Sequence, residues 1–390
     1  MGSTLAWPFR PAAADRPRRL RSIDGGGIRG LIPIEVLVEL ERQLAERSGR
    51  PDAVLADHFD LVAGTSAGAL VAAAISIGRP MVQTRQFVVE NAGRMFKAAA
   101  WHKRLWHLYD EGEFEARIKA FLGEHTRLGS PELRTGVLLV MRNATTDSPW
   151  IVSNNPFAPF NERTLDDCNL ELELWRLARA SAAAPVYFAP EVVTLGRAKP
   201  YKFIFVDGAL TGFNNPAFKA FLYATTGPYG LNWPASEEQL TVVSLGTGYS
   251  RHVDIALRPR RMGLFWNIGE VPRALILASD REQDLLCRTF GACRMGPAID
   301  VEVGDMRGAR SAVPRKLFTY FRINTWLTGE KLAELGVPDP EALAASRLDA
   351  VANADGLRRV GEALASRDVT PQLLDYLLAG GPGVSPSSNS

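Results

Sequence analysis

The sequence predicts a layered α/β fold with a mostly parallel central sheet, followed by a more helical C-terminal part. Two consecutive units, within residues 19–49 and 58–78, each contain a short apolar strand, a glycine-containing turn and a helix. Further short apolar runs alternate with helical stretches up to about residue 245. Because strands that alternate with helices form parallel sheets covered by helices, we expect the chemistry at the carboxyl ends of the strands.

The first unit begins with an extended segment at 19–23 that ends in Asp24-Gly25-Gly26-Gly27. The following run, GLIPIEVLVELERQLAERSG, has apolar residues at helical spacing. These residues are Leu31, Ile34, Leu37, Val38, Leu44 and Ala45. Pro33 is tolerated in a first helical turn, where its missing N–H has no partner to lose, and Gly49 ends the helix.

The second unit is HFDLVAG, a short strand, and ALVAAAISI, a buried helix, with Thr65-Ser66 at the turn between them. Residues 61–78 carry no charge and are just numerous enough to raise the question of a membrane span. Glycines and hydroxyl side chains interrupt this stretch, and Pro80 closes it. These features favour a strand, a tight turn and a buried helix over a span.

The rest of the chain shows further elements of both kinds. Strands are expected at 137–141, 203–206, 240–245 and in LFTYFRIN; helices are expected at 83–98, 112–122, 171–183, 268–289, 340–346 and 355–366. We divide the chain into a loose leader (1–18), a main domain (19–250), a C-terminal extension that completes or caps it (251–379) and a flexible tail (380–390). No linker rich in proline or serine separates the two large parts.

Composition is that of an ordinary globular protein, with 46% apolar and 23% charged residues in 390. The net charge of +2 gives no global field that would attract a nucleic acid polymer. The three cysteines form no CxxC pair, and the arginine-rich start lacks the apolar run of a signal peptide. No histidine lies at a metal-ligand spacing from another ligand. We therefore expect a cytoplasmic protein without a bound metal.

Gly64-Thr65-Ser66-Ala67-Gly68 matches GxSxG, the pattern of a nucleophile elbow. Such a turn holds the serine in a strained conformation, and Gly64 and Gly68 let the neighbouring backbone pass. Ser66 would lie at a helix N-terminus, whose dipole favours a developing alkoxide. The pattern also arises by chance in glycine-rich chains, so a turn with an incidental serine is the alternative.

Asp24-Gly25-Gly26-Gly27-Ile28-Arg29-Gly30 is a second glycine-rich signal. Its backbone N–H groups can converge on a phosphate or on the oxyanion of an acyl-transfer intermediate. A dinucleotide-binding loop competes with this interpretation, because Gly25, Gly27 and Gly30 satisfy GxGxxG. Against it, the next strand ends in the GTSAG turn where the nucleotide fold needs an acidic residue.

Asp207 follows the apolar run FIFV and precedes Gly208-Ala209, so its carboxylate can project from a strand end and accept a serine proton. A structural turn at the strand end is the alternative. A further alternative is that a histidine is the base for Ser66. In α/β hydrolases the catalytic histidine follows the catalytic acid in the sequence, and of the five histidines only His252 follows Asp207.

In this order, DGGGIRG, GTSAG and DGA resemble the patatin-like phospholipase family. The resemblance extends to RASAAAPVYFAP, Asn214-Asn215-Pro216 and VVSLGTG, and it covers about residues 19–250. It implies a three-layer sandwich with Ser66 as nucleophile and Asp207 as its partner in a catalytic dyad. It also implies an oxyanion hole from Gly25, Gly26 and Gly27, supported by Arg29. Ala67 and Ala209 stand where relatives often have other small residues or glycine.

The family resemblance further implies a phospholipase A-type lipid acyl hydrolase that works without a cofactor, through an acyl-enzyme. Its partner would be a phospholipid or another acyl lipid, which requires peripheral association with a membrane during turnover. Three other interpretations stay open. They are a nucleotide-binding module using the glycine loop, a non-lipid esterase with a histidine-containing triad, and a catalytically silent scaffold.

Two groups of side chains suggest contacts with lipid or regulator. Trp101 and Trp106, interleaved with His102, Lys103, Arg104 and His107, suit a membrane interface or a helix end packed in the core. Clustered cations suit phosphate recognition, anionic head groups or a solvated face. They are Arg251, Arg258, Arg260, Arg261, Arg307, Arg310, Arg315 and Lys316. Since similar bacterial effectors include members activated by cyclic nucleotides, a cyclic nucleotide activator is one candidate partner.

Overall fold

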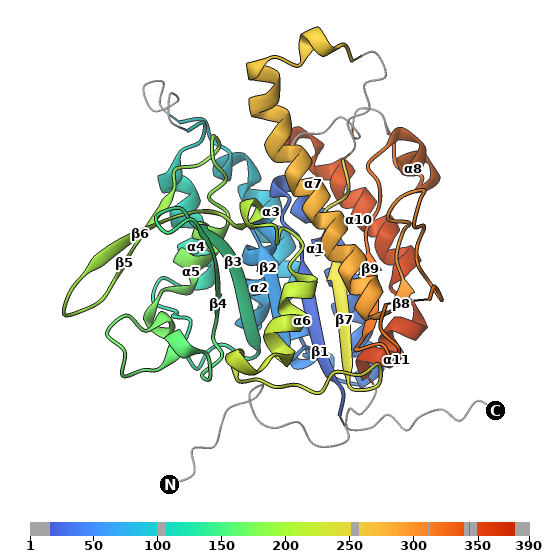
Figure 1. The fold of residues 1–390 in the computed structure, drawn as a ribbon, viewed down its shortest axis with the longest axis horizontal. Coiled ribbons are helices and arrows are strands. Elements are labelled where there is room, and N and C mark those ends of the chain that lie inside the picture. The colour runs from blue at the N-terminus through green and yellow to red at the C-terminus, as the bar shows by residue number, and fades with distance from the viewer. Residues whose placement is uncertain are drawn as a thin grey trace.

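The structure is a computed structural model that describes residues 16–99, 107–250, 257–310, 312–338, 343 and 349–378. Within these residues nine strands form one sheet, in the order β5-β6-β3-β2-β1-β7-β9-β8, with β4 paired to β3 off this path (Figure 1). The strands are β1 (Arg18–Ile23), β2 (Leu61–Thr65), β3 (Gly136–Asn143), β4 (Ser148–Ser153), β5 (Glu191–Leu195), β6 (Tyr201–Asp207), β7 (Leu240–Leu245), β8 (Ala292–Met295) and β9 (Thr319–Ile323). The α-helices are α1 (Leu31–Ser48), α2 (Ala67–Ser76), α3 (Met81–Met95), α4 (Glu111–Leu122), α5 (Leu174–Ser181), α6 (Ala217–Thr225), α7 (Leu264–Phe290), α8 (Gly329–Glu334), α10 (Ala354–Asp368) and α11 (Pro371–Leu378).

The centre of the sheet is parallel, which confirms the predicted fold class. β1 pairs in parallel with β2 and β7, and β2–β3, β7–β9 and β8–β9 are parallel too. Antiparallel pairing is confined to the side formed by β3, β4, β5 and β6. The sequence did not predict the strands β4, β5 and β8. Pro149 near the start of β4 resembles a turn signal, and β5 is a short strand with every second residue exposed.

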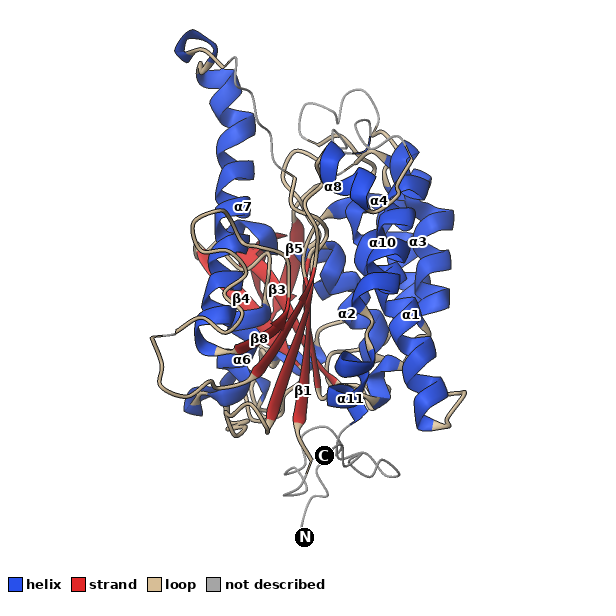
Figure 2. Cartoon of the chain, turned by 90° about the vertical axis from the view of Figure 1, so that its right-hand side faces the viewer, coloured by secondary structure: helices blue, strands red, loops and turns tan. Residues whose placement is uncertain are grey.

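Alternate residues of each strand point to opposite faces of the sheet, and both faces are covered. Ile23 and Val62 belong to one buried cluster, with α1, α2, α5 and α10. Leu20 and Ala63 belong to a second cluster, with α6 and the C-terminal end of α7. Figure 2 shows the resulting three layers, with helices on both sides of the strands.

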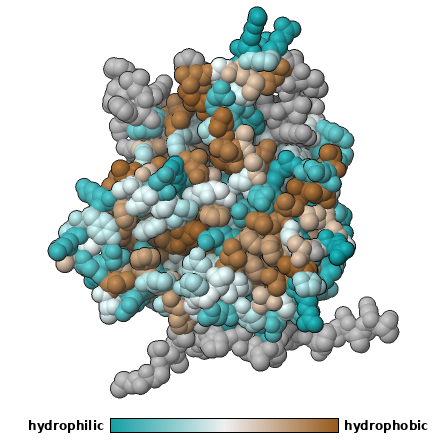
Figure 3. Space-filling view, in the orientation of Figure 1, coloured by the Kyte–Doolittle hydropathy of each residue, from teal (hydrophilic) through white to brown (hydrophobic). Residues whose placement is uncertain are grey.

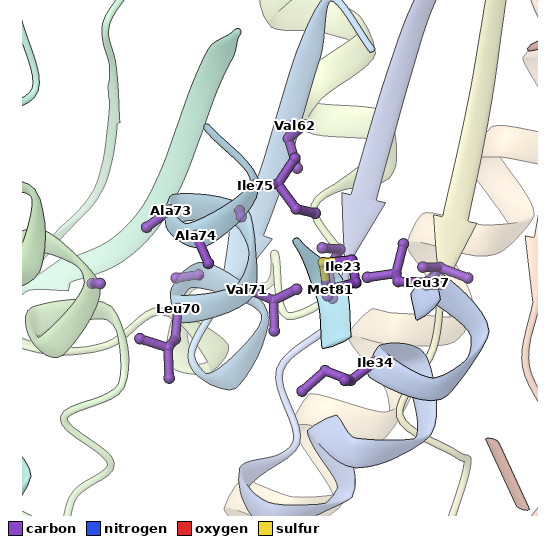
Figure 4. Packing of buried hydrophobic residues seen from close by; sticks show 14 of the residues in the cluster. Ile23, Ile34, Leu37, Val62, Leu70, Val71, Ala73, Ala74, Ile75 and Met81 are labelled. Atoms are coloured by element: carbon purple, nitrogen blue, oxygen red, sulfur yellow. The ribbon is translucent and has the colours of Figure 1, made fainter. Parts of the chain in front are cut away.

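The uncharged stretch at 61–78 forms β2 and the buried helix α2 in the core. Figure 4 shows Val62 of β2 beside Ile75 of α2, and Val71 of α2 in the same cluster as Ile23 of β1 and Ile34 of α1. In the described part of the chain no helix is long and apolar enough to cross a membrane.

Helix α1 begins and ends as predicted, and polar contacts tie it to its neighbours. Gly49 has a φ of 64°, the left-handed conformation that ends helices. The buried Glu35 carboxylate accepts hydrogen bonds from Arg85 (3.1 Å) and Arg358 (2.6 Å). The first is on α3 and the second on α10, so this carboxylate joins three helices of the same layer.

The C-terminal part contributes strands to the same sheet, because β9 pairs with β7 and β8 with β9. The expected leader at 1–18 needs correction at its end. Arg18 is the first residue of β1, and both Arg16 and Arg18 form ion pairs with the buried Asp60. Residues 16–18 therefore belong to the fold. Residues 1–15, the tail at 380–390 and most of the expected helix at 340–346 lie outside the described residues.

Candidate active site

Ser66 occupies the sharp turn between β2 and α2. Its φ of 55° and ψ of −125° are a strained combination for a residue other than glycine. The flanking glycines are required by close backbone contacts. A Cβ on Gly64 would lie 2.2 Å from the Gly68 carbonyl oxygen, and one on Gly68 would lie 2.3 Å from the Ile23 carbonyl oxygen. The turn therefore has the geometry of a nucleophile elbow.

The register of the sheet brings Asp207 to Ser66. Thr65, the last residue of β2, pairs with Val140 of β3, and Asp207, the last residue of β6, pairs with Met141. Since β4 occupies the other edge of β3, β2 and β6 share one edge, and β6 ends where β2 ends. Two strand ends more than a hundred residues apart thus meet at one point.

The Ser66 hydroxyl donates a hydrogen bond to Asp207, with Oγ 2.7 Å from Oδ2. The other carboxylate oxygen, Oδ1, accepts from the Ala209 N–H at 2.8 Å, so the carboxylate cannot rotate freely. Asp207 is buried, and burial raises its pKa to about 6 even though both hydrogen bonds favour the charged form. A carboxylate with this pKa is a stronger base than an ordinary aspartate.

Ser181, at the end of α5, positions the elbow from the other side. Its hydroxyl oxygen accepts from the Ser66 backbone N–H at 2.8 Å and donates to the Val140 carbonyl oxygen at 2.5 Å. Two residues later, the Ala183 carbonyl accepts from the Asp207 N–H at 3.0 Å. The sequence pointed to RASAAAPVYFAP only as a family stretch, and its contacts with both Ser66 and Asp207 depend on the fold.

The glycine loop between β1 and α1 passes over Ser66. A Cβ on Gly25 would lie 3.0 Å from the Ser66 Cβ. The Gly25 N–H donates to the Asn214 carbonyl at 3.1 Å, so in this structure it already has an acceptor, unlike the oxyanion donor expected from the sequence. Gly26 and Gly27 have no acceptor for their N–H groups within the described residues. The Arg29 N–H donates to the Gly26 carbonyl at 3.1 Å and closes the turn.

Comparison with known proteins places this arrangement in a family. Residues 22–221 match the family model for patatin-like phospholipases, and this range contains the elbow, the glycine loop and Asp207. The chain belongs to the patatin-like phospholipase family. It is 32% identical to Patatin-17 of Solanum cardiophyllum and 31% identical to Patatin-2-Kuras 3 of Solanum tuberosum. Each match spans 251 residues, 60% of this chain and 61% of the relative, so the chain covers about three fifths of these relatives.

A likeness to a solved structure accompanies this family match. Human GIVD cytosolic phospholipase A2 aligns with 93% of this chain and 60% of its own, with a TM-score of 0.45 and 11% sequence identity.

In this patatin-like chain, distant residues hold the glycine loop in place. Asp24, at the start of the loop, accepts two hydrogen bonds from the buried Arg322 of β9, at 3.0 and 2.5 Å. The amide nitrogen of Asn214 donates to the Gly25 carbonyl oxygen at 3.4 Å. The same nitrogen donates to both carboxylate oxygens of Asp280 on α7, each at 3.0 Å. Burial, together with the nearby charge of Asp24, raises the pKa of Asp280 to about 8.

The Arg29 side chain lies near α7. Burial lowers its pKa to about 10, which the charge of Asp280 partly opposes, so Arg29 still carries its charge at neutral pH. Sequence reasoning did not assign Arg322, Asn214 or Asp280 to the site. The sequence offered two signals near these residues: LFTYFRIN was expected as a strand, and Asn214-Asn215-Pro216 belonged to the family resemblance without an assigned role.

No histidine of the described residues contacts Ser66 or Asp207. His58 precedes β2, at the end of the strand opposite Ser66, and burial lowers its pKa to about 4. His252 lies outside the described residues. The described residues also contain no group of three or more metal-ligating side chains that could hold an ion.

The expected basic cluster is not one site. Arg258, Arg260 and Arg261 precede the N-terminus of α7, whereas Lys316 donates to the Arg288 and Thr289 carbonyls near its C-terminus. Because α7 has 27 residues, it separates these two groups by about 40 Å. Arg251 lies outside the described residues, as do Trp101 to Trp106.

Proposed function

We propose that this patatin-like protein is a lipid acyl hydrolase of the phospholipase A type, which cleaves acyl esters of membrane glycerolipids through a Ser66–Asp207 dyad. The observation that carries the proposal is the 2.7 Å contact between Ser66 Oγ and Asp207 Oδ2 at a strained elbow. The glycine loop in contact with Ser66 supplies two N–H groups that have no acceptor among the described residues. Nucleophile, base and oxyanion donors therefore lie together.

In the first step, Asp207 Oδ2 takes the hydroxyl proton as Ser66 Oγ bonds to the ester carbonyl carbon. The carbonyl oxygen gains the negative charge, and the N–H groups of Gly26 and Gly27, with the N-terminus of α2, stabilise it. When the intermediate collapses, the C–O bond to the alcohol breaks and the alcohol leaves with the proton from Asp207. An acyl-Ser66 ester remains.

In the second step, Asp207 takes a proton from water as the water oxygen attacks the acyl-enzyme. The same N–H groups hold the second oxyanion, and Ser66 leaves with the proton as the fatty acid is released. Only the ionised carboxylate can accept a proton. Since the pKa of Asp207 is about 6, we expect kcat/KM to fall as the pH drops below about 6.

Two alternative functions fit the site less well. A dinucleotide loop needs several free N–H groups and space for a pyrophosphate, but the Gly25 N–H is occupied and a Cβ on Gly26 would lie 2.3 Å from Thr247 Oγ1. A histidine triad would place an imidazole between Ser66 and Asp207, which are in direct contact. We expect His252→Ala to keep most of the wild-type activity, and a variant as inactive as Ser66→Ala would favour the triad.

The test combines active-site labelling with hydrolysis of phospholipid vesicles. Wild-type protein should react with a fluorophosphonate probe and release fatty acid, and Ser66→Ala and Asp207→Asn should each lose at least about a thousandfold in kcat/KM. Ser48→Ala and Asp147→Asn are matched controls on the surface and should behave as wild type. A Ser66→Ala protein that keeps more than about a tenth of the wild-type activity would exclude Ser66 as the nucleophile.

A further inference from the structure

Helix α7 has two different halves. Its C-terminal half is buried beside β8 and β9, whereas its N-terminal half projects beyond the end of the sheet where β1 and β2 finish (Figures 1 and 2). The projecting half carries large apolar side chains in solvent. They are Leu264 (73% exposed), Ile268 (62%), Val271 (45%) and Leu275 (65%).

These four residues, which we name the α7 stripe, lie on one side of the helix. Their spacings of four, three and four residues keep them within about 60° of one another at 100° per residue. The buried residues Asp280, Asp284 and Cys287 point to the opposite side, toward the fold. Exposing a continuous row of Leu, Ile and Val is unfavourable in water, so such a row marks a surface for contact.

The charges beside the stripe are positive. Residues 258–275 contain four arginines and one acidic residue, Glu270, which gives an excess of three positive charges. The arginines are Arg258, Arg260, Arg261 and Arg273. Glu270 forms an ion pair with Arg273, so the three exposed arginines at the tip have no acidic partner within this segment. In Figure 3, hydrophilic side chains lie at the projecting end and hydrophobic ones gather beneath them.

The same helix contributes to the active site. Ser279 follows Leu275, the last residue of the stripe, by four positions. A Cβ on Gly212 would lie 3.9 Å from the Ser279 Oγ. The next residue, Asp280, accepts hydrogen bonds from Asn214, which in turn holds the glycine loop. The stripe and the anchor of the glycine loop therefore lie on one continuous helix.

We propose that the α7 stripe and the arginines at its tip dock the protein on an anionic lipid bilayer. Apolar side chains would enter the boundary between head groups and acyl chains, while the guanidinium groups pair with phosphates of the lipid head groups. The helix lies in the interface, since no described helix is long and apolar enough to span it. That docking helps hydrolysis rests on the proposed function. Binding to the bilayer can be measured without any hydrolysis.

Binding is measured by sedimentation of the full chain with vesicles, in the Ser66→Ala background so that no lipid is consumed. One vesicle is phosphatidylcholine alone and the other is equimolar phosphatidylcholine and phosphatidylglycerol. The triple variant Leu264→Ser/Ile268→Ser/Leu275→Ser should lower the partition coefficient at least about tenfold on anionic vesicles. Replacing the three arginines by glutamine should lower it by about a hundredfold, and high salt should have a similar effect on the parent protein.

The matched control is Val82→Ser/Val301→Ser, which replaces exposed valines (49% and 105% exposed) on other elements and should bind like the parent. Thermal unfolding and size-exclusion chromatography with light scattering accompany each variant. If the triple variant does not fold, Ile268→Ser against Val82→Ser gives the same comparison. Equal partition of stripe and control variants would overturn the proposal. So would a stripe variant that turns a dimer into a monomer without changing partition, which would assign the stripe to a second copy.

The two proposals fail separately. If vesicle binding depends on the stripe but the wild-type protein hydrolyses no ester, the docking surface stands and the proposed function falls. If the wild-type protein hydrolyses vesicle lipid and the stripe variants bind and hydrolyse equally well, the function stands and the docking surface falls.

Discussion

Replacing Asp207 by asparagine should abolish hydrolysis and, at the same time, stabilise the fold. Asparagine keeps an oxygen that can accept from the Ala209 N–H or the Ser66 hydroxyl, but it carries no charge to bury. The wild-type carboxyl has a pKa of about 6 in the folded protein, against an ordinary aspartate pKa of 3.8 in the unfolded chain. The charged form is therefore disfavoured by folding, and its removal favours the folded state.

The size of the effect depends on pH in a defined way. Below about pH 4 the carboxyl is protonated in both states and ionisation costs no stability. As the pH rises toward 6, the unfolded chain loses its proton first, and wild-type stability decreases relative to the variant. Above about pH 6 both states are ionised, and a shift of about two pKa units corresponds to about 3 kcal/mol. At pH 5 we expect about half of this difference.

The assay is urea unfolding of wild type and Asp207→Asn at a series of pH values from 5 to 8, with hydrolysis measured on the same samples. Ser66→Ala is the control, because it is inactive but keeps the carboxyl. A variant that is less stable than wild type at pH 7, or a difference that does not grow between pH 5 and pH 7, would refute the conclusion that Asp207 is a buried base with a raised pKa.

Three further predictions concern the elbow, the loop anchor and regulation. Ser66→Gly should be more stable than Ser66→Ala by about 1 kcal/mol, because only glycine adopts a φ of 55° and a ψ of −125° without strain, although both variants are inactive; equal unfolding free energies would remove the argument for a strained elbow. Arg322→Met should lower the unfolding free energy by about 3 to 5 kcal/mol, because it leaves the buried Asp24 carboxylate without its ion-pair partner. The double variant Arg322→Met/Asp24→Asn should recover part of this loss, and a double variant no more stable than Arg322→Met would contradict the explanation. If a cyclic nucleotide activates the protein, micromolar nucleotide should raise the rate of vesicle hydrolysis. Replacing the three arginines before α7 should remove this stimulation but leave hydrolysis of a short-chain p-nitrophenyl ester unchanged. No response to any nucleotide of a panel would exclude the nucleotides tested as activators.

Local sequence patterns predicted the chemistry-bearing turns and most of the elements around them. The helical spacing of apolar residues located α1, and Gly49 marked its end at the residue where φ becomes 64°. GTSAG identified the turn at Ser66, and the apolar run before Asp207 identified a strand end. These features depend on residues within a few positions of one another, because helical periodicity, turn conformation and strand alternation are local properties of the chain.

The tertiary structure decided which groups are free to act and which hold others in place. The Gly25 N–H is occupied by Asn214, Ser181 holds the Ser66 backbone, and Arg322 reaches Asp24 across 298 residues of sequence. Basic residues that the sequence grouped as one cluster, such as Arg260 and Lys316, lie near opposite ends of α7. None of these outcomes has a local signal. The partner of a backbone group or a buried charge is set by strand order and register, and these depend on contacts between segments that are far apart in the chain.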